Sequence, residues 1–271
     1  MQVLVDATRP TILSFNSVER LLRGDFFHTV TRSDVVNALH AFPPAWRVAG
    51  LGTTNWYRRN GEILLDGTAS APRFLWADPA ADPPGRLVDL DAIAHEPDWV
   101  VPPVDEDPAV PHFPFMAVGV WDPEGRREVC RLSPGADLFA AVETWCEGAN
   151  IGLAAVCGAA PALDVGFQAM CHIPLGGVSP DRPPGIEHGR RQGVAWEVQG
   201  FYIANPTIRA LLSRENLALH LHGREAAGTA GGHLDAATVL EEVDVEVWPL
   251  LDLVLQVRGL DAARLPVRDV S

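Results

Sequence analysis

Apolar and polar residues alternate in short runs along most of the chain, a pattern that predicts many short strands and few helices. In the first half, helix-like spacing covers residues 14–23, 31–39 and 136–147, and strand-like runs cover residues 46–50, 62–65, 73–76 and 115–121. In the second half, strand-like runs cover residues 151–157, 163–171, 194–203, 217–222 and two stretches within 243–257, with a short helix at 207–213. We therefore predict an α+β fold whose second half forms a barrel or a sandwich.

Residues 78–114 break this pattern, because the stretch is dense in proline and aspartate, with Pro83-Pro84 and Asp105-Glu106-Asp107. Proline donates no backbone hydrogen bond, so such a stretch cannot sustain a long ladder or helix. We interpret it as an extended surface excursion, either a plain insertion or a lid. We expect two domains: residues 1–150 as an α+β domain that carries this excursion, and residues 151–271 as a β-rich domain.

The charge balance excludes several classes of function. Basic residues number 21 and acidic residues 35, so the formal net charge is −14, and every basic side chain is an arginine. Strong acidity argues against partners such as duplex nucleic acid or an anionic membrane, which need a basic face. The lack of lysine excludes Schiff-base chemistry on this chain. We expect a small-molecule substrate instead.

Cysteine usage and hydropathy predict a cytoplasmic location. The four cysteines stand at irregular spacings without a Cys-x-x-Cys pair, as expected for buried thiols in a reducing compartment. The start of the chain lacks the pattern of a signal peptide, and no apolar run approaches the ~20 residues of a membrane-spanning helix.

Three histidines near the C-terminal end carry the strongest chemical signal. His220 and His222 lie two apart in a strand-like run and therefore share one face, while the leucines beside them face the core. Residues 223–232 contain enough turn formers to reverse the chain, and the glycines before His233 allow close approach. A hairpin would bring His233 alongside the other two. Three neutral ligands leave a coordination position open, which is typical of a catalytic metal centre that holds Zn²⁺ or another divalent transition metal.

Motifs along the chain resemble those of the α-acetolactate decarboxylases. His-Leu-His, ten residues and Gly-Gly-His-Leu match that family's three-histidine zinc site, as His220, His222 and His233. Upstream, the segment at 50–55 (Gly-Leu-Gly-Thr-Thr-Asn) and the segment that contains Gly61-Glu62 are similar to family segments, as is Phe-Pro-Phe at 113–115. The resemblance implies a two-domain α+β fold with a mixed-sheet N-terminal domain and a β-barrel-like metal-binding C-terminal domain, often in a homodimer.

The resemblance also implies a chemistry, that of a decarboxylating lyase. The family's metal binds the oxygens of a 2-hydroxy-3-oxo acid and stabilises the enediolate left by loss of carbon dioxide. Glu62 matches the family glutamate that reaches the metal, so we expect it to act as a further metal ligand and as the catalytic residue that relays a proton. Its alternative interpretation is a solvated residue in an Asn-Gly-Glu turn.

Two family features lack a counterpart. Counting along the chain places Gly166 where the family carries an arginine that faces the substrate carboxylate. Arg190 and Arg191, which we place in the loop before the next strand, are either substitutes or solvated loop charges. The family's second glutamate, near its C-terminus, has only Asp269 in its vicinity here.

Three functions remain open. The first is an acetolactate-type decarboxylase. The second is a metal-dependent cyclase, isomerase or hydratase that acts on a β-dicarbonyl or ketol in biosynthesis, acetolactate activity having been lost with the arginine. The third is a non-catalytic protein related to small DNA-binding domains with a Gly-Gly-His-Leu hairpin, against which the acidic charge and the chain length argue.

Overall fold

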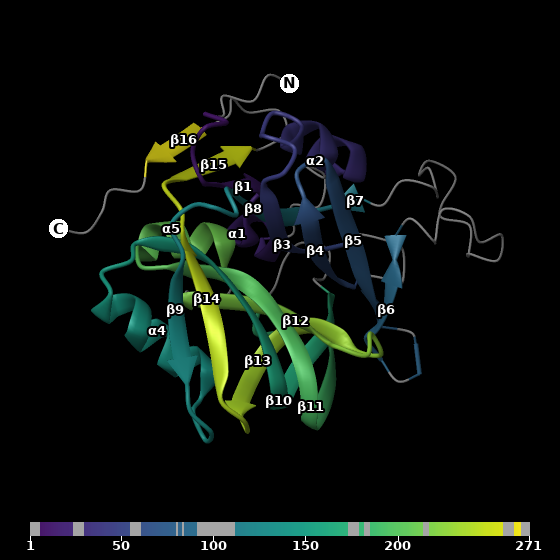
Figure 1. Ribbon diagram of the computed structural model, residues 1–271. Coiled ribbons are helices and arrows are strands. Elements are labelled where there is room, and N and C mark those ends of the chain that lie inside the picture. The colour runs from purple at the N-terminus through teal and green to yellow at the C-terminus, as the bar shows by residue number, and fades with distance from the viewer. Residues whose placement is uncertain are drawn as a thin grey trace, which may run out of the picture.

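A computed structural model describes residues 6–23, 30–54, 61–79, 81–82, 84–90, 112–172, 179–181, 185–213, 217–256 and 263–266. Two large sheets, stacked one above the other in Figure 1, dominate this part of the chain. A short pair of strands, β2 (Val30–Thr31) and β7 (His112–Phe113), accompanies them.

The first sheet has eight strands in the order β16-β15-β1-β8-β3-β4-β5-β6. Its strands are β1 (Thr11–Phe15), β3 (Arg47–Thr53), β4 (Glu62–Thr68), β5 (Ala71–Asp78), β6 (Arg86–Asp89), β8 (Phe115–Trp121), β15 (Asp252–Gln256) and β16 (Ala263–Pro266). Strands β1 and β15 pair in parallel, whereas β1 and β8 pair antiparallel, so the predicted mixed sheet is confirmed.

The second sheet has six strands in the order β11-β12-β13-β10-β14-β9. They are β9 (Glu128–Leu132), β10 (Leu153–His172), β11 (Gly185–Ile203), β12 (Leu219–Glu225), β13 (Gly231–Val239) and β14 (Val243–Pro249). Strand β10 also pairs with β11, so four strands hydrogen-bond in a circuit. Because β14 and β9 extend the sheet outward from β10, the description of this half as β-barrel-like stays a prediction.

Helices cover the outer faces of both sheets. Helix α2 (Arg32–Leu39) begins with a capping box between Thr31 and Asp34 and packs on the first sheet. Helix α4 (Leu138–Gly148), capped by Asp137, packs on the second. Helices α1 (Val18–Leu22) and α5 (Pro206–Leu212) contribute to the apolar core between the two sheets. None of the helices within the described ranges is long and apolar enough to cross a bilayer.

Most predicted elements are present, with four corrections. Part of the helix expected over residues 14–23 is strand β1, and α1 is only five residues long. The runs at 151–157 and 163–171 form one strand, β10, whose register shifts near Pro161. Arg190 and Arg191 lie within β11 rather than in a loop. The excursion expected at 78–114 contains the regular strand β6, while residues 91–111 fall outside the described residues.

The two sheets do not follow the expected domain boundary at residue 150. Strand β9, which precedes it, belongs to the second sheet, and strands β15 and β16, near the C-terminal end, complete the first sheet. In Figure 1 the two yellow strands β15 and β16 lie in the upper sheet, beside strands from the beginning of the chain. A division into residues 1–150 and 151–271 stays a prediction.

Candidate metal centre

The three histidines lie on the hairpin formed by β12 and β13. On β12, Leu219 and Leu221 are fully buried in the core beneath α4, so His220 and His222 face the first sheet. His222 pairs directly with His233 of β13. Gly232 has a φ of +147°, and a Cβ there would lie 2.0 Å from the Gln168 carbonyl oxygen, so only glycine fits. The predicted hairpin is confirmed.

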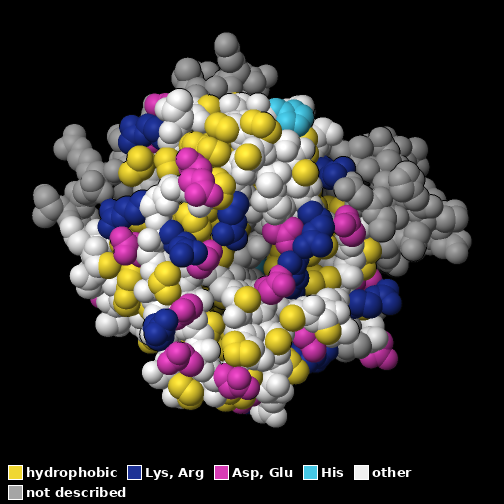
Figure 2. Space-filling view, viewed as in Figure 1, with side chains coloured by type: hydrophobic (Ala, Val, Ile, Leu, Met, Phe, Trp, Pro, Cys, Tyr) yellow, Lys and Arg dark blue, Asp and Glu magenta, His cyan; other side chains and the backbone are white. Residues whose placement is uncertain are grey.

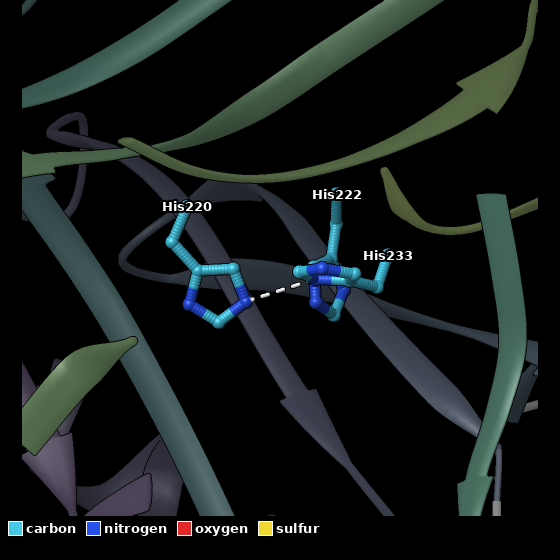
Figure 3. A group of neighbouring side chains, drawn as sticks. All are labelled: His220, His222 and His233. Carbon is cyan, nitrogen blue, oxygen red and sulfur yellow. Dashed lines mark hydrogen bonds between the residues drawn. The ribbon is translucent and has the colours of Figure 1, made fainter. Parts of the chain in front are cut away.

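The three imidazole rings converge on one point between the sheets (Figure 3). His220 Nε2 lies 3.1 Å from His233 Nδ1, and one ring nitrogen from each histidine lies within 4.8 Å of the others. Ring centroids are separated by 4.9 to 5.4 Å. His220 and His222 are buried, and the His233 side chain is 16% exposed.

Backbone carbonyls fix the orientation of two rings. His220 Nδ1 donates to the Leu212 carbonyl at 2.6 Å, at the end of α5, where helix carbonyls lack partners within the helix. His222 Nδ1 donates to the Ile63 carbonyl of β4 at 2.9 Å. A neutral ring that donates from Nδ1 keeps its lone pair on Nε2. These hydrogen bonds therefore leave both Nε2 atoms able to bind a metal ion.

The environment of His222 keeps this imidazole neutral. Burial, followed by the neighbouring His220, holds the pKa of His222 well below its usual range, and the hydrogen bond to Ile63 opposes this shift. A neutral imidazole is the form that binds metal ions.

Glu62 begins strand β4 and faces the histidines. Its side chain is 8% exposed, and its Oε2 lies 3.7 Å from His222 Nε2. Glu62 pairs with Thr53 of β3, which also lines the site. The position is therefore buried beside the cluster, unlike the solvated turn residue of the alternative interpretation.

A cavity of about 60 Å³ adjoins the cluster. Its polar side consists of the three histidines, Glu62, Thr53 and Gln168, and its apolar side of Val18, Leu21 and Leu22 from α1 with Phe115 from β8. A small molecule in this cavity would contact the histidines on one side and an apolar wall on the other.

The position matched to the family arginine is open. A Cβ on Gly166 would meet no atom within 4 Å, and Gly166 lies two residues before Gln168, on the same face of β10. Arg190 pairs directly with Gly166 and therefore shares this face. Arg191 points the other way: its guanidinium lies 3.7 Å from Glu225 and 6.0 Å from the Phe167 ring centroid.

The donor set fits a divalent transition metal. A tetrahedral ion with bonds of about 2.0 Å holds neighbouring nitrogens about 3.3 Å apart, close to the 3.1 Å between His220 and His233. Two rings present an acceptor nitrogen toward the same point, and a carboxylate lies beside them. Three imidazoles with a carboxylate suit zinc and its neighbours better than calcium or magnesium.

A second, charged cleft lies between the sheets at the other end of β4. Figure 2 shows arginine and acidic side chains interspersed around a hollow on this face. The charges pair with one another: Arg224 donates to Glu197 at 2.7 Å and to Asp66 at 2.5 Å, and Arg47 contacts Glu246 at 3.2 Å. We interpret this cleft as a structural ion-pair network.

Comparisons with solved structures define the fold. No protein-family model and no curated protein matches the chain. A Staphylococcus aureus protein described as similar to α-acetolactate decarboxylase matches with a TM-score of 0.60 and 13% identity, over 91% of this chain and 88% of that one. α-Acetolactate decarboxylase from Bacillus subtilis strain 168 matches with a TM-score of 0.60 and 16% identity, over 91% and 88%.

The chain thus has the fold of acetolactate decarboxylase across most of its length. The acetolactate decarboxylase of Bacillus subtilis subspecies spizizenii gives the same result, with a TM-score of 0.58 and 14% identity over 91% of this chain and 89% of that one. The family resemblance predicted from the motifs is confirmed at the level of the fold.

Sequence reasoning missed several residues around the centre. Gln168 lies directly opposite His233 on β10, and Asp235 follows His233 on β13. Helix α1 forms the apolar wall. The carbonyls of Leu212 and Ile63 orient two rings but carry no side-chain signal, so the sequence could not identify them.

Proposed function

We propose that this protein is a metal-dependent carbon–carbon lyase of the acetolactate decarboxylase type that acts on a small 2-hydroxy-3-oxo substrate. The observation that carries the proposal is the convergence of His220, His222 and His233 beside buried Glu62, within the fold of acetolactate decarboxylase. Zinc is the ion we propose. The acidic surface argues for a soluble small-molecule substrate rather than a nucleic acid.

Each part of the site has a role in this chemistry. The three histidines would hold the cation, which when bound supplies positive charge that stabilises an enediolate. Loss of carbon dioxide breaks the bond to the carboxylate carbon and leaves its electron pair in the enediolate. Glu62 would relay a proton from solvent to the enediolate, which converts the enediolate to the product ketol. The apolar side chains of α1 would exclude water from the reacting carbon.

Gly166 supports a second candidate function. A substrate carboxylate would find no side chain at this position, because glycine leaves the space open. A cyclase, isomerase or hydratase that acts on a neutral β-dicarbonyl or ketol needs no guanidinium there, yet uses the same enolate-stabilising centre. Arg190, on the same face, is the residue on which the choice between the two functions depends.

Incubation with racemic acetolactate, followed by detection of acetoin, tests the first function. We expect acetoin from the zinc-loaded wild type and none from His222→Ala at equal protein concentration. The matched control is His40→Ala, which removes an exposed histidine at the end of α2, away from the cluster. A zinc-loaded wild type that forms no acetoin but catalyses proton exchange at the α-carbon of neutral ketols would favour the second function.

A further inference from the structure

Asp235 lies two residues after His233 on β13 and therefore shares its face, at an irregularity of the strand. Strand β13 pairs with β10 through Gly166 opposite Ala236 and Phe167 opposite Leu234, so Asp235 is the extra residue of a β-bulge. Such bulges are over-represented next to functional sites. Here the carboxylate lies beside His233, two residues earlier in the chain, and its Oδ1 is 3.9 Å from His233 Nε2.

Two further side chains hold this carboxylate in place. Gln168 Nε2 donates to Asp235 Oδ1, the oxygen that faces His233. His188 Nδ1 lies 3.3 Å from Asp235 Oδ2. Because Gln168 and His188 pair directly across β10 and β11, the strand register itself places both donors on the carboxylate. Gln168 is buried, and its hydrogen bond together with the His188 contact defines the orientation of Asp235.

The two nitrogens of His233 therefore face different partners. Its Nδ1 lies toward His220 within the cluster, and its Nε2 lies toward Asp235. Metal-binding histidines commonly direct their second nitrogen to a carboxylate or a backbone carbonyl, which fixes the tautomer and strengthens the ligand. His220 and His222 have backbone carbonyls in this role. For His233, the group in the corresponding position is a carboxylate.

We propose that Asp235 is a positioning residue of the metal centre, which orients His233 and increases its basicity as a ligand. This inference rests on the proposed metal site. A carboxylate beside the outer nitrogen favours the tautomer with the proton on Nε2 and the lone pair on Nδ1. Asp235 also lines a separate cavity beneath α4, with Phe139 and Glu143, so the outer side of His233 is reached from a different direction than the substrate cavity.

Zinc affinity, measured by competition with a chromophoric chelator, tests this role. We expect Asp235→Asn, which keeps the size of the side chain but removes its charge, to weaken zinc binding about 10- to 100-fold. The matched control is Asp164→Asn on β10, whose carboxylate accepts from the Gly193 N–H at 3.0 Å, a bond that an amide oxygen can also accept. Its zinc affinity should equal that of the wild type.

Cobalt substitution separates positioning from a structural role. Co²⁺ shifts the N–H proton signals of ligating imidazoles in NMR spectra, and we expect Asp235→Asn to move the His233 signal while those of His220 and His222 stay in place. The metal-free variant should unfold at the same urea midpoint as the metal-free wild type. Zinc affinity within twofold of wild type, with an unmoved His233 signal, would overturn the role of Asp235 alone. A wild type that binds neither ion would overturn the metal site as well.

Discussion

The neutral, buried His222 makes the metal-free protein sensitive to acid. In the unfolded chain this imidazole takes up a proton near pH 6.5, whereas in the folded protein its pKa is held well below that. Between the two values the unfolded state binds more protons, so the contribution to stability is complete above about pH 6.5 and is lost as the pH falls. Only 2% of the side chain is exposed, so solvent does not screen the effect. One proton corresponds to a loss of about 1.4 kcal/mol between about pH 7.5 and 5.5.

Urea unfolding of chelator-treated protein at these two pH values measures this loss. The comparison variant is His222→Gln, whose amide does not titrate and still offers an N–H to the Ile63 carbonyl. Titrating groups that do not contact His222 contribute equally to both proteins and cancel in the difference. We expect the wild type to lose about 1.4 kcal/mol more than the variant. Equal losses would refute the assignment of a neutral, buried imidazole at this position.

Three further predictions concern single residues. Glu62→Gln should reduce turnover about 10²- to 10⁴-fold while zinc content stays that of the wild type; loss of zinc together with activity would instead make Glu62 chiefly a ligand. Gly232→Ala should lower the free energy of unfolding by about 1–3 kcal/mol, because a Cβ would meet the Gln168 carbonyl and the backbone has a positive φ. An unchanged midpoint in denaturant titrations would contradict this. Arg190→Ala should raise KM about tenfold for a carboxylate-bearing ketol acid and leave KM for a neutral ketol unchanged; equal effects on both substrates would exclude Arg190 as the anchor.

The histidine cluster could be predicted because its three members are close together in the sequence. All three lie within one hairpin. Side chains two residues apart on a strand share a face, and the diglycine before His233 allows the turn that brings the third histidine alongside. Glu62 is more than 150 residues away in sequence, and only the family resemblance placed it at the site. Its position depends on the stacking of two sheets, where His222 reaches the Ile63 carbonyl of β4, and no local pattern encodes that contact.

Other features depend on geometry that residue patterns do not specify. Pro161 suggested a break between two strands, yet β10 continues through it, because a proline is tolerated where the register shifts and a ladder bond is absent. Arg190 and Arg191 suggested a loop, but β11 pairs with β10 through this stretch. Arg190 is exposed there, and Arg191 contacts Glu225. Asp235 shares the face of His233 by simple alternation, but its contacts with Gln168 and His188 come from other strands, and no local pattern specifies them.

Metal analysis of the purified protein tests the central claim most directly. Protein prepared without chelators, loaded with zinc and dialysed, should retain about one equivalent per chain, as expected for a three-histidine site. The triple variant His220→Ala, His222→Ala, His233→Ala should retain less than about a tenth of an equivalent. His40→Ala, which alters an exposed histidine at the end of α2, should match the wild type. A folded wild type that retains no zinc, or retains as much as the triple variant, would contradict the account.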